Sequence, residues 1–153
     1  MAAGRMNIVS PSFAFGERIP DRYTQSGEDL EPPLKWSGVP QGAEELALVC
    51  HDPDAPRLYG FTHWVVYGIA PNVATIGGED KPAFVNGCND YGVEGYRGPN
   101  SPSGHGTHSY YFFLIALDAE LGLEPGLSRL ALLPQLADHV IESARHVGTF
   151  SRL

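Results

Sequence analysis

The sequence predicts a mostly β protein that forms a single domain over residues 1–153. Its 18 glycines and 13 prolines favour many turns and short strands over long helices. Three apolar runs have the length and composition of strands. A chain of 153 residues is also long enough to bury about two-thirds of the surface that it exposes when unfolded. We therefore expect a fold that needs neither a disulfide nor a metal for its stability.

The chain before residue 41 contains many residues that break regular structure. Segments such as SPSF and ERIPDRYT combine proline with polar turn residues. We expect irregular segments and edge strands here that wrap around a core. Five large apolar side chains are expected to hold them to it: Phe13, Phe15, Tyr23, Leu34 and Trp36.

Three strands are predicted after this region. Residues 45–52 (ELALVCHD) form a short apolar run that is ended by the prolines of DPDAP. Residues 61–69 (FTHWVVYGI) are rich in β-branched and aromatic side chains, which favour strands. Residues 109–118 (SYYFFLIALD) form the longest apolar run, so we expect this strand to be central in its sheet.

The C-terminal part of the chain is the only part with helical periodicity. A proline is favourable at the first position of a helix, and Pro134 precedes apolar residues at helical spacing. Gly148 provides a stop, with basic side chains in the last turn. We expect a C-terminal helix that covers a sheet, with these apolar positions: Leu136, Ala137, Val140, Ile141 and Ala144.

Charge and composition exclude several classes of partner. The formal net charge is −8 with only 10 lysines and arginines, so we expect no nucleic acid as a partner. The N-terminal residues lack the apolar stretch of a signal peptide, and no apolar run is long enough to cross a membrane. We expect no membrane insertion and a cytoplasmic location. Cys50 and Cys88 are accordingly expected to stay reduced.

Glycine, serine and histidine are concentrated just before the longest apolar run. Residues 95–113 read GYRGPNSPSGHGTHSYYFF. A segment of this composition passes through tight turns, and its backbone N–H groups need partners. Successive N–H groups in a glycine-rich turn form a concave donor site for an anion, and neighbouring histidines can add positive charge.

Polar residues stand at or near the ends of the three predicted strands. If the strands are neighbours, four of these residues converge at one end of the sheet, with the glycine-rich loop as the rim: Asp52, His63, His108 and Tyr110. Asp52 would orient a histidine and favour its imidazolium form, which pairs with an anion. Tyr110 would add a hydroxyl donor. The sequence thus predicts a pocket for a small anion.

Each of these residues also has a purely structural interpretation. Aspartates beside prolines commonly bond to their own backbone in turns, and a histidine within a strand commonly belongs to the core. A competing functional interpretation is a metal site with these ligands: Asp52, His63, His105 and His108. Spacing on a glycine-rich loop fixes no ligand geometry, so we expect no metal and no cofactor. The nearby serines lack the GxSxG motif of many hydrolases: Ser101, Ser103 and Ser109.

At these residues the sequence resembles the phosphatidylethanolamine-binding protein family, in its bacterial, Raf-kinase-inhibitor-like branch. Two signature regions of the family match DPDAP and the segment from GYRGP to HSY. The matching segments follow the family's order over nearly the whole chain: YTQSGEDLEPPLKWSGVP (23–40), HDPDAP (51–56), THWVVYGI (62–69), NDYGVEGYRGP (89–99), GHGTHSYYFFLIALD (104–118) and ADHVIESARHVGTFSR (137–152).

The resemblance implies an antiparallel β-sandwich with a short C-terminal helix and an anion pocket at one end of the central strands. The implied ligand is phosphate or a phosphorylated headgroup. The implied ligand-binding residues are Asp52, His63, Gly98, His108 and Tyr110, and the implied supporting residues are Asp54, Pro56 and Gly104. The resemblance also implies a homodimer and a protein partner, which would be a kinase or a protease.

Two departures from the family's pattern bear on ligand selectivity. The bacterial branch usually has Cys-Pro-Pro after the GP dipeptide, where this chain has Asn100-Ser101-Pro102. Glu31 stands where a small serine is usual. We expect a binding protein whose anion pocket influences a protein partner. The alternatives are an enzyme that uses the aspartate and histidine as an acid/base pair, and an interaction protein with a vestigial pocket.

Overall fold

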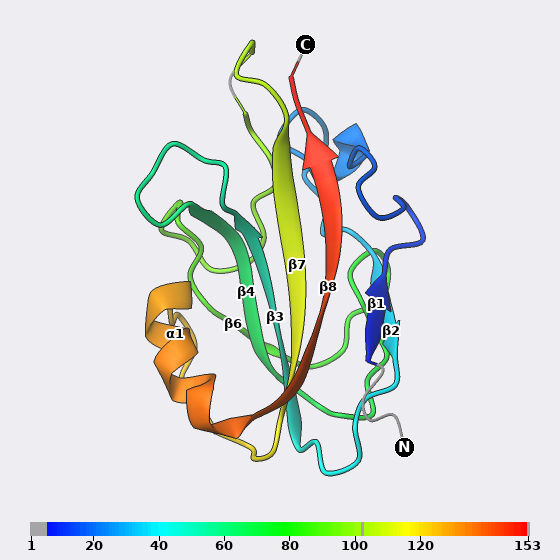
Figure 1. Cartoon of the computed structure of the whole chain (residues 1–153), viewed down its shortest axis with the longest axis vertical. Coiled ribbons are helices and arrows are strands. Elements are labelled where there is room, and N and C mark those ends of the chain that lie inside the picture. Colours follow the sequence, from blue (N-terminus) through cyan, green and yellow to red (C-terminus); the bar gives the residue numbers. More distant parts are fainter. Residues whose placement is uncertain (1–5, 102, 153) are drawn as a thin grey trace.

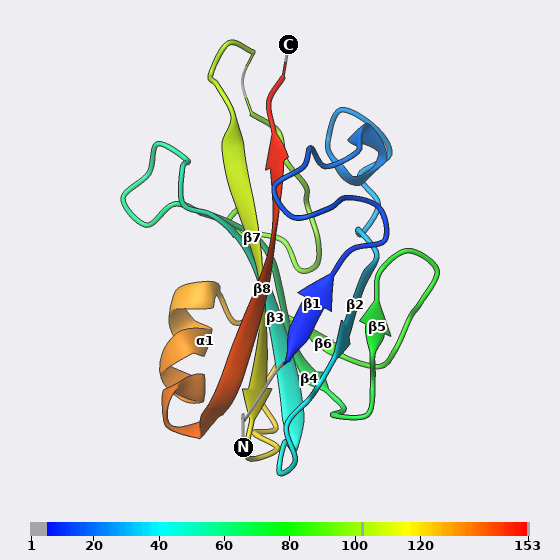
Figure 2. The ribbon, with the colours of Figure 1, turned by 45° about the vertical axis from the view of Figure 1, so that its right-hand side comes forward.

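The computed structural model describes residues 6–101 and 103–152. These residues form two antiparallel sheets, with strand orders β1–β2–β5 and β6–β4–β3–β7–β8 (Figures 1 and 2). The elements in chain order are β1 (Asn7–Val9), η1 (Asp21–Tyr23), β2 (Leu34–Ser37), β3 (Glu45–Asp52), β4 (Phe61–Ile69), β5 (Thr75–Ile76), β6 (Val85–Asn86), β7 (His108–Leu117), α1 (Arg129–Leu136), η2 (Ala137–His139) and β8 (Val140–Phe150).

The main core is formed by side chains from both sheets. The smaller sheet contributes Ile8, Trp36 and Ile76, and the larger one contributes residues such as Leu48, Trp64 and Phe112. A second buried cluster lies on the other face of the larger sheet, where α1 packs against β3 and β4. The predicted mostly β fold, an antiparallel sandwich with one helix near its C-terminus, is confirmed.

The three predicted strands are all present. β3 and β4 coincide with residues 45–52 and 61–69, and β7 begins one residue before residues 109–118. β3 is buried at every position because core residues pack on one of its faces and α1 on the other. β3, and not β7, is the central strand of the five, although β7 pairs with neighbours on both of its edges.

Four of the five side chains expected to hold the N-terminal region to the core are buried: Phe13, Tyr23, Leu34 and Trp36. Phe15 is the exception, because 62% of it is exposed. It lies in a turn whose next residue, Gly16, donates its N–H to the Val147 carbonyl. The backbone of this turn, rather than the Phe15 ring, is therefore bonded to the sheet.

The predicted boundaries of the C-terminal helix are wrong. The helix ends at Leu136, and residues 140–150 form the longest strand, β8. Pro134 lies inside α1 rather than at its first position, and Ser128 caps the helix by accepting the Ala131 N–H. β8 pairs with β7 from Leu117 to His108, and this long ladder overrides the local helical spacing.

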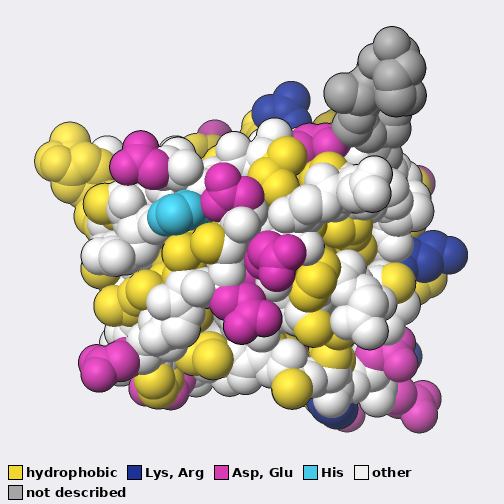
Figure 3. Space-filling model, turned by 90° about the horizontal axis from the view of Figure 1, so that it is seen from below, with side chains coloured by type: hydrophobic (Ala, Val, Ile, Leu, Met, Phe, Trp, Pro, Cys, Tyr) yellow, Lys and Arg dark blue, Asp and Glu magenta, His cyan; other side chains and the backbone are white. Residues whose placement is uncertain are grey.

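One end of the larger sheet is rich in acidic side chains. Acidic side chains gather at the end where β3 begins (Figure 3). Glu44, Glu45 and Glu120 line a hollow there, and the buried Glu45 carboxylate accepts the N–H groups of Gly68 and Leu121. The predicted pocket residues lie at the opposite end, where β3 finishes.

Both cysteines are free. Cys50 is buried in the main core and Cys88 is half-buried. Within the described residues, none of the helices combines the length and the apolar character that crossing a membrane requires.

Candidate functional site

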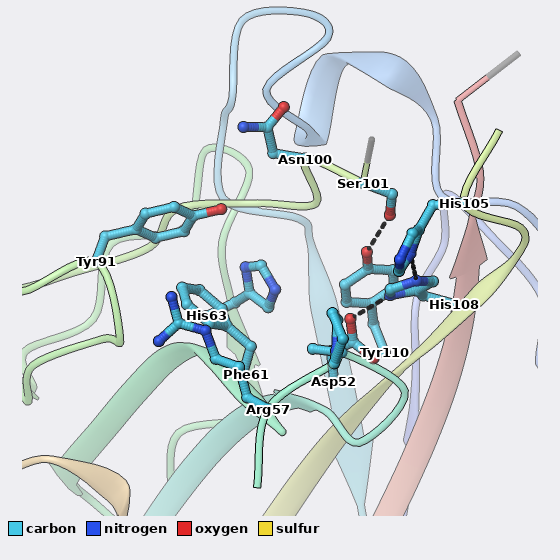
Figure 4. A pocket seen from close by; sticks show the side chains of 12 residues that line it. Asp52, Arg57, Phe61, His63, Tyr91, Asn100, Ser101, His105, His108 and Tyr110 are labelled. Carbon is cyan, nitrogen blue, oxygen red and sulfur yellow. Dashed lines mark hydrogen bonds and ion pairs between the residues drawn. The ribbon is translucent and has the colours of Figure 1, made fainter. Parts of the chain in front are cut away.

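A pocket of about 330 Å³ opens where β3 ends and where β4 and β7 begin (Figure 4). The strand order β4–β3–β7 makes these strands neighbours, and their antiparallel pairing brings the three termini to one end of the sheet. This is the convergence that the sequence predicted. The lining residues are Asp52, Ala55, Pro56, Arg57, Phe61, His63, Tyr91, Asn100, Ser101, His105, His108 and Tyr110.

A buried aspartate–histidine pair lies on one side of this pocket. His108 Nδ1 is 2.7 Å from Asp52 Oδ2, and both residues are buried. The other carboxylate oxygen, Oδ1, accepts the N–H of Asp54. Burial raises the pKa of Asp52, while the hydrogen bonds from His108 and Asp54 act in the opposite direction. Asp52 therefore has both roles considered for it: it bonds to its own turn, and it orients a histidine.

The second ring nitrogen of His108 contacts another histidine. His105 Nδ1 lies 3.0 Å from His108 Nε2 (Figure 4). When Nδ1 of a neutral His108 donates to Asp52, its Nε2 is an acceptor, and His105 supplies the proton. His105 is exposed, on the turn that precedes β7. A ligand that approaches His108 Nε2 therefore meets His105 first.

His63 is held as a neutral ring. Its Nδ1 lies 2.7 Å from the Arg97 carbonyl oxygen, and a carbonyl can only accept, so the proton is on Nδ1. Burial lowers the pKa of His63 to about 4, although its backbone hydrogen bond raises it. The neutral ring leaves Nε2 as an acceptor. His63 therefore brings an acceptor to the pocket and no positive charge at neutral pH.

Tyr110 provides a hydroxyl group at the base of the pocket. Its oxygen lies 3.0 Å from Ser101 Oγ, and burial raises its pKa above the ordinary value of 10. The group thus stays protonated and can donate. Because the bond of Ser101 is to a phenol and not to a histidine, the serine lacks the base that a hydrolase nucleophile requires.

Among the lining residues outside the predicted site are one arginine and two aromatic residues: Arg57, Phe61 and Tyr91. The guanidinium of Arg57 lies over the Phe61 ring, 4.9 Å from its centroid. Tyr91 contacts Phe61 edge-on, with the ring centroids 4.7 Å apart. Arg57 directly follows DPDAP, and Phe61 begins β4. The sequence therefore offered only one indication that Arg57 and Phe61 line the pocket, which is their closeness in the chain to predicted pocket residues.

Two of the predicted supporting residues, Asp54 and Pro56, lie in the loop after β3. Asp54 Oδ2 accepts the N–H of Ser109, 2.8 Å away, and so ties this loop to the beginning of β7. Pro56 lines the pocket itself. Gly104 lies in the exposed turn before β7 with a positive φ of 77°, a conformation that favours glycine.

Gly98, which was expected to bind the ligand, is not among the described residues that line the pocket. Its N–H donates to Asp29 Oδ1, and its carbonyl accepts from Gln25. A side-chain carbon at Gly98 would lie 2.6 Å from Asp29 Oδ1. The glycine therefore allows two segments to approach closely, and its N–H already has an acceptor within the protein.

The competing metal interpretation finds no geometric support in this part of the chain. Over residues 6–101 and 103–152, no three histidine, cysteine or acidic side chains are placed to share an ion. Instead, His105 is hydrogen-bonded to His108, and His108 is hydrogen-bonded to Asp52.

The structure locates part of the two departures from the family's pattern. Glu31 Oε1 lies 3.6 Å from Lys81 Nζ. In the segment Asn100-Ser101-Pro102, Pro102 is outside the described residues.

Comparisons with known proteins agree with this architecture. A family model described as phosphatidylethanolamine-binding protein matches residues 9–151. A UPF0098 protein of Methanothermobacter thermautotrophicus is 44% identical over 96% of this chain and 99% of its own length. LppC of Mycobacterium tuberculosis, named as a candidate lipoprotein, is 43% identical over 97% of this chain and 74% of its own length.

A solved structure gives the same result for the fold. The homologue CT736 from Chlamydia trachomatis, whose name assigns it to the phosphatidylethanolamine-binding proteins, is 35% identical and superposes with a TM-score of 0.92. The alignment covers 99% of this chain and 100% of that one. The whole chain, including β8 and the pocket loops, thus has a counterpart in a known structure.

Proposed function

This chain belongs to the phosphatidylethanolamine-binding protein family, and on that basis we propose that it is a binding protein whose pocket holds a small anion. The observation that carries the proposal is the buried Asp52–His108 pair. A carboxylate 2.7 Å from Nδ1 balances the charge of an imidazolium, so that a protonated His108 can be accommodated and can bind an anion.

The other groups in the pocket narrow the class of ligand. Tyr110 and Arg57 can donate to an anionic oxygen, whereas the neutral His63 ring can accept. An anion that carries its own proton donor satisfies both kinds of group. Hydrogen phosphate has a hydroxyl group and phosphoethanolamine has an ammonium group. We therefore propose phosphate or a phosphorylated headgroup of this type as the ligand.

Calorimetric titration of phosphate and phosphoethanolamine at pH 6 and pH 8 tests this proposal. We expect stronger binding at pH 6, where more imidazolium is present. The variant His108→Ala should lose binding and keep its fold by circular dichroism. A matched control is His139→Ala, because His139 also pairs with an aspartate, at 2.8 Å, but lies outside the pocket. Wild-type affinity in the His108 variant would rule out the assignment.

A protein partner near the pocket is the second part of the proposal. The loop after β3 exposes 89% of Leu58 and 64% of Tyr59 beside the pocket residue Arg57. Exposed apolar side chains next to a ligand site offer a contact surface to another protein. In line with the family resemblance, we propose that this partner is a kinase or a protease, and that occupancy of the pocket alters its binding.

The alternative function is an enzyme that uses the same residues for proton transfer. The specific observation in its favour is the chain of hydrogen bonds from Asp52 through His108 to the exposed His105. Such an arrangement can move a proton between a bound molecule and the protein. Turnover of a small molecule that is lost in Asp52→Asn would favour this alternative.

A further inference from the structure

Another cavity lies on the face of the larger sheet that α1 partly covers. Leu132 and Leu136 of α1 pack against β3 and β4, and the helix leaves the outer face of β7 beside it uncovered (Figure 1). Between the helix and β7 lies a groove of about 390 Å³. This volume is within the range of about 300–1,000 Å³ that small-molecule sites occupy. Its lining residues are Val49, His51, Phe113, Ile115, Arg129, Leu133, Val140 and Ser143.

Most of this groove is apolar. Phe113 and Ile115 contribute side chains from β7, and Leu133 contributes one from α1. Leu133 remains 39% exposed, and Val140, at the beginning of β8, remains 47% exposed. These exposed side chains line one groove rather than standing singly on the surface. A ligand with an apolar body would remove this surface from water, which favours binding.

One end of the groove carries a positive charge without an acidic partner. Arg129 Nη2 lies 3.3 Å from His51 Nε2. A guanidinium keeps its protons, so His51 accepts here and is neutral, with Nδ1 facing Thr62 Oγ1 at 2.9 Å. Burial, followed by the charge of Arg129, lowers the pKa of His51 to about 4. Among the described residues, no ion pair includes Arg129.

The position of Arg129 on the helix is also informative. It is the first residue of α1, where the helix dipole is positive and a basic side chain is unfavourable. An anion bound at this end would interact favourably with both the guanidinium and the dipole. Arg129 thus brings a positive charge to one end of an apolar groove in a chain whose net charge is −8.

We propose that this groove is a second ligand site, which takes a small amphiphilic anion such as an aliphatic carboxylate. The carboxylate would lie at Arg129, and the apolar body would lie along Phe113, Ile115 and Leu133. A second copy of the chain is a less favourable occupant, because two molecules of charge −8 repel each other. The proposal does not depend on the anion pocket, because Asp52 and His51, although adjacent in sequence, line different cavities.

Decanoate is a suitable probe, and calorimetry measures its binding. We expect one site per chain, and affinities at least about tenfold weaker in Arg129→Gln and in Leu133→Ser. Arg22→Gln is the matched control, because Arg22 is exposed in η1 and lies outside the groove lining. The affinity of His108→Ala should equal that of the wild type, which separates this site from the anion pocket. Circular dichroism checks that each variant is folded.

Three outcomes would overturn the proposal. The first is the absence of decanoate binding by the wild type. The second is equal binding by the Arg129 and Arg22 variants, which would indicate adsorption without a specific site. The third is a dimer in sedimentation experiments that Leu133→Ser dissociates and decanoate leaves intact, which would make the groove an interface between two copies.

Discussion

His63 and His108 differ in the partner of Nδ1, and this difference sets what each ring offers to a ligand. His63 Nδ1 donates to a backbone carbonyl, and its buried ring is neutral because its pKa falls to about 4. His108 Nδ1 faces the Asp52 carboxylate, which can balance a positive ring. The pocket thus combines a fixed acceptor with a site for an imidazolium, a combination suited to anions that also carry a donor.

The neutral state of His63 predicts a loss of stability in mild acid. The pKa of this histidine is 6.5 when unfolded and about 4 when folded. Between these values the unfolded chain binds more protons, so the free energy of unfolding decreases as the pH falls through this window. The loss is complete below about pH 4 and is on the order of 3 kcal/mol.

Urea unfolding at pH 7 and at pH 4.5 measures this effect. His63→Gln keeps a donor for the Arg97 carbonyl and does not titrate, so its stability should fall less than that of the wild type over the same interval. The surface variant His139→Gln should behave as the wild type. An identical pH dependence in all three proteins would show that His63 is not the residue responsible.

At the scale of elements, strands with a strong apolar pattern were predictable and β8 was not. β3, β4 and β7 are apolar runs of sufficient length to be recognised from the sequence. In β8, the residues opposite Tyr110, Phe112 and Leu114 are Gly148, His146 and Ala144, so a glycine and a histidine interrupt the apolar pattern of the side facing the core. Its strand conformation depends on pairing with β7, and the local sequence pattern carries no information about that pairing.

β8 packs closely against the core at Gly148. A side-chain carbon at this position would lie 2.5 Å from Ile19 Cγ1 and 2.6 Å from Phe13 Cε2. Both neighbours are buried, so Gly148→Ala should lower the free energy of unfolding by about 1–3 kcal/mol. Ser143→Thr adds one carbon at an exposed position of the same strand and should change it by less than about 0.5 kcal/mol. Equal effects of the two substitutions in urea unfolding would contradict this packing.

At the scale of the whole molecule, the proposed anion site lies where three neighbouring strands begin or end. The sequence indicated four of the converging residues because each stands near a strand terminus: Asp52, His63, His108 and Tyr110. The contacts of Arg57 and His105 were not predictable, because both lie on loops whose course is set by tertiary contacts. Acidic side chains gather at the other end of the sheet, which makes that end unfavourable for a small anion (Figure 3).

An NMR titration of phosphoethanolamine, followed through the imidazole nitrogens, is the sharpest test of the proposed anion site. We expect saturable changes with one dissociation constant at His63 and His108, no change at His139, and a ligand phosphorus signal that does not convert to product. Conversion of the ligand would instead support the enzyme alternative. Changes of equal size at His139, or none at His63 and His108, would contradict an anion site formed by the Asp52–His108 pair.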